Sequence, residues 1–178
     1  MTDVKRLHWG CGESPVPGWV NCDQWEFEGV EVVGDILDGL PFDDDTFDYA
    51  FSNHALQEVG MYDQEVALGE LRRVLKPGGV LRMVLPDMDR AIDAYRAGNH
   101  EYFLADEFET ISGNFVAHML WHGYTKTPLN FELFEELARK GGFREIREVA
   151  FKQTASRHPE ITELDSREGE SFFVEAVK

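Results

Sequence analysis

Basic side chains are nearly missing from the first half of this 178-residue sequence. Between Leu7 and Leu71 there is no lysine or arginine, whereas the same stretch carries 15 aspartates and glutamates. A protein surface that neutralises nucleic-acid phosphates needs clustered lysine and arginine. Because the whole chain has a formal net charge of −17, we expect no nucleic-acid partner. The acidity itself either keeps the protein in solution or attracts a cationic ligand.

Cysteines and long apolar segments are scarce as well. The only cysteines are Cys11 and Cys22, which are too few for a disulfide framework and indicate free thiols in a reducing cytoplasm. No apolar run approaches the roughly 20 residues that cross a bilayer, so we expect no membrane segment. The opening residues MTDVKRLHWG lack the apolar core of a secretory signal. The length suits one domain over residues 1–178, because no linker or repeat divides it.

A series of short apolar runs is the first positive signal. These runs lie near residues 5–9, 19–22, 30–33, 47–51 and 80–85. Each run predicts a strand buried in a sheet. Between the last two runs, apolar residues recur at helical spacing from Ala55 to Lys76, and Pro77-Gly78-Gly79 is expected to end that helix. Strand, helix and strand in this order predict a βαβ unit, and hence an α/β fold with a parallel sheet.

The second half of the chain is less regular. A short helix is predicted over Asp89–Ala97, and Asn130 is predicted to cap a second helix in the stretch FELFEELARKGGF. Residues 101–129 are mixed and aromatic and match no single pattern. The segments Ile146–Phe151 and Ser171–Val177 predict two late strands that form an antiparallel hairpin at the sheet edge, joined by a polar and partly helical link.

The stretch LHWGCGESPVPGWVNCDQ has features of a nucleotide-binding loop. Gly10 and Gly12 follow the first predicted strand, and Asp23 ends the second. Ligands of open α/β sheets bind beyond the carboxyl ends of strands, where glycine allows close approach and an acid accepts hydrogen bonds from ribose hydroxyls. A lone G-x-G also occurs in ordinary turns. Asp35 ends the next run and is followed by Ile36-Leu37, which suits a purine, although both acids could be solvated strand ends.

Several motifs in order resemble one known family. L-H-W-G-C-G, N-C-D, G-D-I, L-P-F-D-D-D-T-F-D and R-V-L-K-P-G-G together resemble the class I S-adenosylmethionine-dependent methyltransferases, in particular the small type 11 methyltransferases. The resemblance is strong over residues 5–88 and looser to the final FFVEAV. It implies a Rossmann-like domain with a mostly parallel sheet and a C-terminal antiparallel hairpin. It also implies S-adenosylmethionine as cofactor and S-adenosylhomocysteine as product.

The resemblance assigns the cofactor site residue by residue. Gly10, Cys11 and Gly12 would lie against the methionine part, and Asp23 would hold the ribose hydroxyls. It places Asp35, Ile36 and Leu37 around the adenine. It places Ser52 and Asn53 at the sulfonium end. Trp9 and Gln24, which neighbour these positions, complete the expected site. The acid-rich first half would suit the cationic sulfonium.

Three departures from the family pattern qualify this assignment. Only nine residues, Gly10 to Gly18, stand where most members have the first crossover helix, so we expect that helix to be missing or very short. A related subgroup with P-G-W after the glycine loop shares this shortening. Gln57-Glu58 replaces the Glu-His pair that the family often carries. The given sequence begins at the first strand, so we expect no N-terminal helical lid.

The candidate proton acceptors are four residues near the expected pocket: His54, Asp87, His118 and His122. Methyl transfer to oxygen or nitrogen needs an aligned acceptor and, where required, a base, for which histidine is suited near neutral pH. His54 could instead begin a helix, and Asp87 could simply open one. His118 and His122, four apart, would share a helical face if that stretch is helical. They lack a third metal ligand and form no H-E-x-x-H motif, so we predict no metal.

We therefore expect a cytoplasmic methyltransferase that acts on a small-molecule or sugar-containing (glycan-type) acceptor, with O-methylation preferred. The cofactor-binding part spans about 5–88, an acceptor-side insertion about 95–129, and the C-terminal helix and hairpin about 130–178. A homodimer partner or a large substrate could complete the site. Two alternatives stay open: a non-catalytic module that binds the cofactor and acts through a partner, and an RNA or protein methyltransferase. A Rossmann dehydrogenase is disfavoured because Pro15 occupies the place of the third glycine.

Overall fold

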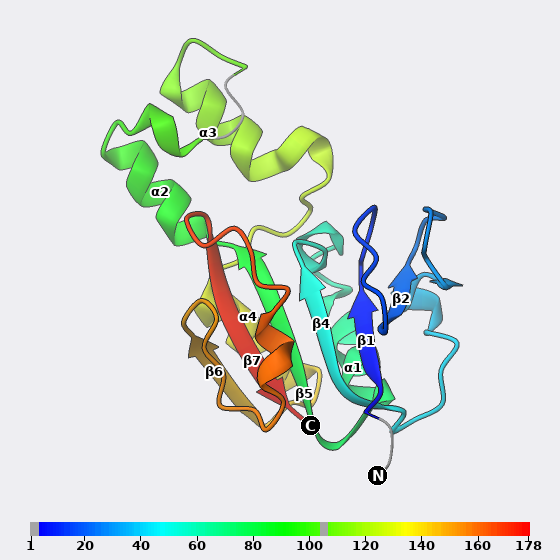
Figure 1. Ribbon diagram of the computed structural model, residues 1–178. Coiled ribbons are helices and arrows are strands. Elements are labelled where there is room, and N and C mark those ends of the chain that lie inside the picture. The colour runs from blue at the N-terminus through cyan, green and yellow to red at the C-terminus, as the bar shows by residue number, and fades with distance from the viewer. Residues whose placement is uncertain (1–3, 104–106) are drawn as a thin grey trace.

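A single twisted sheet organises the computed structural model, which describes residues 4–103 and 107–178. Residues 1–3 and 104–106, which belong to the expected domain and insertion ranges, lie outside it. Within the described part the strand order is β3-β2-β1-β4-β5-β7-β6 (Figure 1). The strands are β1 (Arg6–Trp9), β2 (Val20–Asp23), β3 (Val32–Val33), β4 (Phe47–Asn53), β5 (Leu75–Pro86), β6 (Glu145–Val149) and β7 (Ser171–Val177).

The pairing of these strands confirms the predicted fold class. Strands β1 to β5 are parallel, whereas β7 runs antiparallel to both β5 and β6. The late strands therefore form the expected antiparallel hairpin, with β7 inserted between β5 and β6. Because the carboxyl ends of the parallel strands share one edge of the sheet, the loops that follow them gather there.

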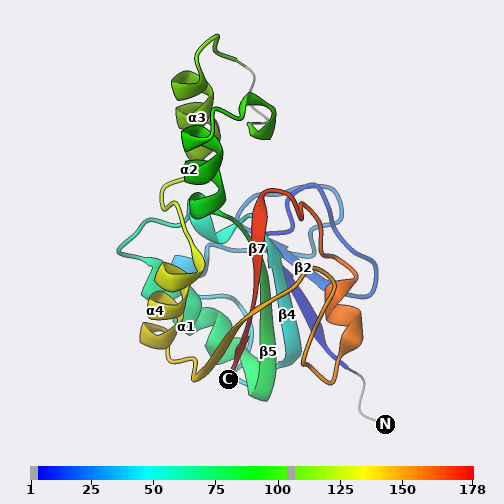
Figure 2. The same cartoon turned by 90° about the vertical axis from the view of Figure 1, so that its left-hand side faces the viewer.

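Two helices cover one face of the sheet. The helix α4 (Phe131–Lys140) begins where the sequence predicts, because the Asn130 side-chain oxygen accepts a hydrogen bond from the Leu133 amide at 3.0 Å. It packs beside α1 (Gln64–Val74), and both helices bury leucines against the sheet. Figure 2 shows α1 and α4 on the same side of the strands.

The helix between β4 and β5 is shorter than the sequence predicts. Instead of beginning at Ala55, α1 begins at Gln64, after a 3-10 turn, η2 (Leu56–Glu58), and a further bend. The buried Gln64 amide donates hydrogen bonds to the carbonyls of Leu56 and Val59 at 3.0 and 2.9 Å, which stabilises the non-helical path. The Pro77-Gly78-Gly79 stop is also misplaced, because β5 already begins at Leu75.

The other face has no first crossover helix, as predicted. Residues 10–19, all of which the structure describes, form turns and a bend and no helix. The link between β6 and β7 covers this face instead. Its 3-10 turn η5 (Pro159–Thr162) brings the buried Ile161 against Trp19, Tyr49 and Phe51, and Figure 2 shows this orange segment on the side opposite α1 and α4. Irregular chain thus replaces a helix as the apolar cover.

A buried ion cluster fixes that link to the sheet. Arg82 of β5 is fully buried, and its guanidinium donates to the Asp165 carboxylate at 2.7 and 2.5 Å. It also donates to Glu175 of β7 at 2.9 Å and to the Gln153 carbonyl at 3.0 Å. Buried charges are tolerated only when they are paired and hydrogen-bonded in this way. The cluster therefore fixes where the link, including residues 164–167, runs over the sheet.

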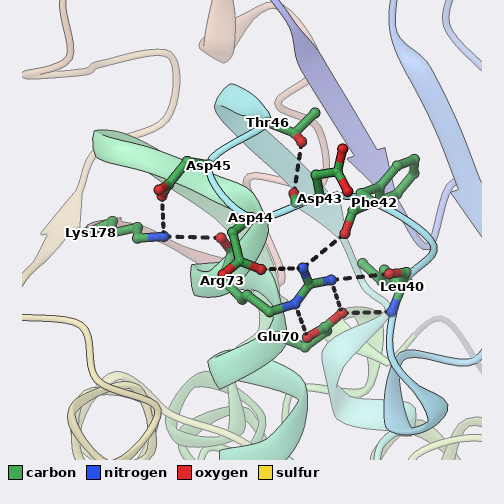
Figure 3. A network of polar contacts seen from close by, with 9 residues as sticks. All are labelled: Leu40, Phe42, Asp43, Asp44, Asp45, Thr46, Glu70, Arg73 and Lys178. Carbon is green, nitrogen blue, oxygen red and sulfur yellow. Dashed lines mark hydrogen bonds and ion pairs between the residues drawn. The ribbon is translucent and has the colours of Figure 1, made fainter.

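A second network explains two of the sequence motifs structurally. Arg73 at the end of α1 donates to the Glu70 carboxylate at 2.7 and 2.8 Å, to the carbonyls of Leu40 and Phe42, and to Asp44 at 2.6 Å (Figure 3). Hydrogen bonding from Arg73 lowers the pKa of Glu70. The R-V-L-K-P-G-G motif thus holds the L-P-F-D-D-D-T-F-D loop, which precedes β4. Both motifs have a folding role at the end of β4 opposite the carboxyl edge.

Two further helices extend beyond the carboxyl edge of the sheet (Figures 1 and 2). These are α2 (Met88–Arg96), within one residue of its predicted bounds, and α3 (Ile111–Leu120), in the stretch that the sequence left unassigned. The 3-10 turn η3 (His100–Tyr102) precedes α3, and Phe103 packs with both helices in a small apolar cluster. The short turns η1 (Ile36–Asp38) and η4 (Trp121–Gly123) complete the described elements. Among the described residues, no helix has the length and apolarity to cross a membrane.

Candidate functional site

A cavity of about 960 Å³ lies at the carboxyl edge of the sheet. Its volume is in the range of sites that bind small molecules and cofactors. The loops after β1, β2, β3 and β4 line one part, and residues from α2, the α3–α4 segment and the β6–β7 link line the rest. Ten of the cofactor residues expected from the sequence line it: Trp9, Gly10, Cys11, Gly12, Asp23, Gln24, Asp35, Ile36, Leu37 and Asn53.

The two glycines of the first loop allow close backbone approach. Gly10 has a φ of +66°, and a Cβ placed on it would lie 2.3 Å from the Cβ of Ala55. Gly12 has a φ of +50°, and a Cβ placed on it would meet nothing within 4 Å. Side chains are disfavoured at both positions, by backbone conformation at each and by a clash at the first. The loop therefore presents bare backbone toward the cavity.

Asp23 joins this loop to the end of β2. Its carboxylate, 7% exposed, accepts hydrogen bonds from the amides of Gly12 at 2.8 Å and Trp25 at 3.0 Å, one on each oxygen. An ionised carboxylate has about four acceptor positions, so both oxygens can still accept from a ligand. Asp23 thus has a structural role in the loop and also the chemistry to bind a diol.

Asp35 lies at the start of η1, on the neighbouring loop. Its carboxylate accepts from the Leu37 amide at 2.9 Å, which is an N-cap interaction. Ile36 is buried, whereas Leu37 is 40% exposed, and both line the cavity. An exposed acceptor beside aliphatic side chains can recognise a flat ring that carries an amino group.

Ser52 and Asn53, at the end of β4, have different environments. Ser52 is 1% exposed and does not line the cavity; its hydroxyl lies 3.8 Å from where a Cβ on Gly10 would be. Asn53 lines the cavity and donates from Nδ2 to the Ser166 hydroxyl at 2.7 Å. Its Oδ1 is buried and has no hydrogen-bond partner among the described residues, which costs free energy unless a ligand or water supplies a donor.

His54 lines the cavity in a strained conformation. Its φ is +51°, and its Nε2 lies 2.8 Å from the Ser171 hydroxyl. Burial, with a smaller contribution from the nearby Arg167, lowers the pKa of His54 to about 3. The ring is therefore neutral near pH 7 and a weak base.

Asp87 also lines the cavity, and its carboxylate caps α2. It accepts from the amides of Asp89 and Arg90 at 3.0 and 3.4 Å and forms an ion pair with the Arg90 side chain at 3.2 Å. The alternative considered from the sequence, that Asp87 opens a helix, is what the structure shows. Its carboxylate is therefore already engaged beside the cavity.

His118 and His122 do not share a helical face, contrary to the sequence expectation. The helix α3 ends at Leu120, and the left-handed φ angles of Trp121 and His122, +41° and +55°, turn the chain away. His118 is partly buried and lines the cavity, and its Nδ1 has no partner among the described residues. Burial lowers the pKa of His118, and the nearby Glu170 offsets this effect only in part. His122 is exposed and outside the lining, 3.5 Å from Glu107.

Several lining residues escaped the sequence analysis. Gln57, noted only as a departure from the family pattern, is buried, and its backbone carbonyl accepts from the amides of Lys126 and Thr127 at 2.9 and 3.0 Å. It thereby ties the segment before α4 to the end of β4. Ser166 and Arg167 come from the β6–β7 link, whose polar composition gave no sign of a site. No spacing in the sequence connects these residues to the glycine loop.

The cavity is strongly acidic. The basic side chains among the described lining residues are those of Lys126 and Arg167. The carboxylates there are Glu13, Asp23, Asp35, Glu58, Asp63, Asp87 and Glu170. Such a cavity attracts a cation more readily than an anion. Among the described residues, no group of three or more histidine, cysteine, aspartate or glutamate side chains is arranged to hold a metal ion.

Comparisons with known proteins agree with this geometry. A family model described as a methyltransferase domain matches residues 10–83. The demethylmenaquinone methyltransferase of Staphylococcus carnosus is 40% identical over 72 residues, which are 40% of this chain and 28% of that protein. The enzyme of the same name from Staphylococcus aureus is 31% identical over 150 residues, 80% of this chain and 60% of that protein. The chain thus spans less than two thirds of either relative.

Solved structures share the whole fold. A protein from Thermotoga maritima, described as a SAM-dependent methyltransferase and "possible histamine N-methyltransferase", superposes with a TM-score of 0.62 at 22% identity. The match covers 100% of this chain and 84% of that one. At this identity the likeness concerns the fold alone.

Proposed function

We propose that the protein transfers a methyl group from S-adenosylmethionine to a small molecule. The premises are that residues 10–83 match the family model of a methyltransferase domain and that the chain has the fold of solved SAM-dependent methyltransferases. The observation that carries the proposal is the acidic cavity where the loops after β1, β2 and β3 meet. Bare glycine backbone, a diol acceptor and an amine acceptor follow one another there in the order of the cofactor's parts.

The residues present fit the cofactor chemically. A Cβ on Gly10 would clash with Ala55, so only glycine lets the loop lie this close to the residues after β4 while its backbone stays bare. Asp23 accepts from the ribose hydroxyls with the lone pairs that Gly12 and Trp25 leave free. Asp35 accepts from the adenine amino group. When bound, the cofactor supplies a methyl group on a positively charged sulfur, and the surrounding carboxylates favour that charge.

We assign His118 as the group that takes the proton from the acceptor. His118 lines the cavity, and its buried Nδ1 has no partner among the described residues; this unpaired nitrogen supports the assignment. His54, with its pKa near 3, binds protons too weakly for this task and instead positions the acceptor as a neutral hydrogen-bonding ring. His122, the other candidate histidine of this segment, is exposed and outside the cavity lining.

The acceptor is proposed to be a small hydroxylated molecule with a flat apolar part. Met88, Met119, Trp121 and Leu129 give this side of the cavity an apolar wall, which favours a ring over a sugar. The relatives named demethylmenaquinone methyltransferase support a ring-bearing acceptor. O-methylation is preferred to N-methylation because a histidine base lies beside the cavity. We also infer a reducing compartment such as the cytoplasm, since both cysteines are buried free thiols.

Calorimetric binding and a methylation assay test this proposal. S-adenosylhomocysteine should bind the purified protein, whereas NAD should not. With a panel of phenolic and quinol acceptors, radiolabelled S-adenosylmethionine should yield a methylated product. The variant His118→Gln should keep cofactor affinity but lose at least tenfold in kcat, whereas the exposed His122→Gln should change neither. Binding of NAD in place of S-adenosylhomocysteine would overturn the proposal.

A further inference from the structure

The β6–β7 link forms one wall of the cavity. Ser166 and Arg167 line it together with Gly10 and Asn53, although more than a hundred positions separate these pairs in the sequence. The Ser166 hydroxyl accepts from Asn53 at 2.7 Å. Asn53 is two residues before Ala55, and Gly10 lies so close to Ala55 that a Cβ placed on Gly10 would clash with it. Arg167 is therefore next in sequence to a residue that contacts the strand end beside the glycine loop.

This wall is rigidly anchored from below. Asp165, directly before Ser166, receives two hydrogen bonds from the fully buried Arg82, and its Oδ2 also accepts from the Lys152 amide at 2.8 Å. The side chains of Arg82 and Asp165 are both 0% exposed. A desolvated pair of this kind holds one geometry, because breaking it leaves an uncompensated buried charge. The buried pair thus fixes the position from which the Arg167 side chain starts.

The amino-acid end of the proposed cofactor needs a cationic partner here. That end carries a carboxylate, and in many α/β nucleotide sites the N-terminus of the first crossover helix binds a negative group. Residues 10–19, which the structure describes in full, contain no helix and no lysine or arginine. Among the described lining residues there are seven carboxylates, and the cationic side chains available to an anion are Lys126 and Arg167.

Arg167 suits this role better than Lys126. The backbone amide of Lys126 donates to the backbone carbonyl of Gln57. The Lys126 side chain lies near Glu58, and its charge partly offsets the rise that burial causes in the pKa of Glu58. Arg167 donates from Nη1 to Glu170 at 3.0 Å, and its side chain is 44% exposed. A guanidinium has five N–H donors in a planar fork that matches a carboxylate. Glu170 orients the fork and leaves other donors for a ligand.

We propose that Arg167, held by the Arg82–Asp165 anchor, binds the carboxylate at the amino-acid end of the cofactor and so replaces the missing first helix. The β6–β7 link would then complete the cofactor site from the far end of the chain. This inference rests on the proposed function, because it takes S-adenosylmethionine as the ligand. It predicts that the contribution of Arg167 depends on the carboxylate and on no other part of that ligand.

The test compares two ligands that differ at one group. S-adenosylmethionine and its decarboxylated form, which keeps the sulfonium and the amine, are titrated calorimetrically into the wild-type protein and into Arg167→Gln. The variant should bind S-adenosylmethionine roughly 10- to 100-fold more weakly, as expected for a lost charge-assisted hydrogen bond. Its affinity for the decarboxylated form should stay within about threefold of wild type. Arg167→Lys, which keeps the charge without the fork, should lie in between.

A matched control lies in the same link. Arg157 is exposed and outside the cavity, so Arg157→Gln should bind both ligands as the wild type does. Equal weakening of both ligands by Arg167→Gln, or no weakening of either, would overturn the inference, as would a selective loss in Lys126→Gln. If the wild type binds neither ligand, the proposed function fails and this inference with it, which is a distinct result.

Discussion

Asp23 provides the sharpest test of the cofactor site, because its carboxylate supports both the loop and the proposed ligand. Asp23→Ala removes the acceptor for the amides of Gly12 and Trp25, at 2.8 and 3.0 Å. Hydrogen bonds to a charged group contribute about 1.5–3 kcal/mol each, and water recovers part of the loss at this cavity edge. We therefore expect the free energy of unfolding to fall by about 2–4 kcal/mol, measured by urea denaturation.

The same substitution should weaken binding of S-adenosylhomocysteine by at least about 100-fold, because two ribose hydroxyls lose a charged acceptor. Asp23→Asn keeps one acceptor oxygen and the side-chain volume. It should therefore recover part of the stability while leaving the affinity low. Asp35→Ala is the comparison for stability, since that exposed carboxylate accepts one amide, and it should cost under about 1 kcal/mol. Full cofactor affinity in folded Asp23→Ala would refute the ribose assignment.

Three further predictions concern folding. Gly10→Ala should cost about 2–5 kcal/mol of unfolding free energy, because it combines a left-handed backbone with a 2.3 Å clash. Gly12→Ala has the left-handed backbone without the clash and should cost about 1–2 kcal/mol. Equal losses in the thermal melts of the two variants would contradict the packing argument. Between pH 6.5 and about 3, His54 is protonated in the unfolded chain but stays neutral in the folded protein. The contribution of neutral His54 to the free energy of unfolding is therefore complete above pH 6.5 and is lost on acidification. His54→Asn should flatten the slope of unfolding free energy against pH in that window by up to about 1.4 kcal/mol per unit, and unchanged slopes would argue against it. Arg82→Met should lose about 3–5 kcal/mol of unfolding free energy by leaving the buried Asp165 and Glu175 without their partner, and Arg82→Met with Asp165→Leu should restore the part that belongs to Asp165, as denaturant titrations would reveal.

Local sequence determined most of the sheet and the half of the cavity that we propose for the cofactor. Short apolar runs fix the parallel strands, and the glycines and acids that follow β1, β2 and β3 must fall at the same edge, because parallel strands end on the same side. The short Gly10–Gly18 stretch likewise excluded a helix, and Asn130 placed the start of α4. Such features depend on neighbours within a few positions, so the sequence alone carries them.

The tertiary structure decided what depends on distant contacts. The apolar pattern predicts a helix from Ala55, but the first part of that stretch forms a turn because buried Gln64 stabilises a non-helical path. The histidine pair was split by the end of α3, which no spacing reveals. Arg167 reached the cavity only because Arg82 pairs with Asp165, 83 positions away. Side-chain periodicity reports the local backbone, whereas a buried charge pair forms only after the sheet has assembled, and it is this pairing that places the β6–β7 link at the site.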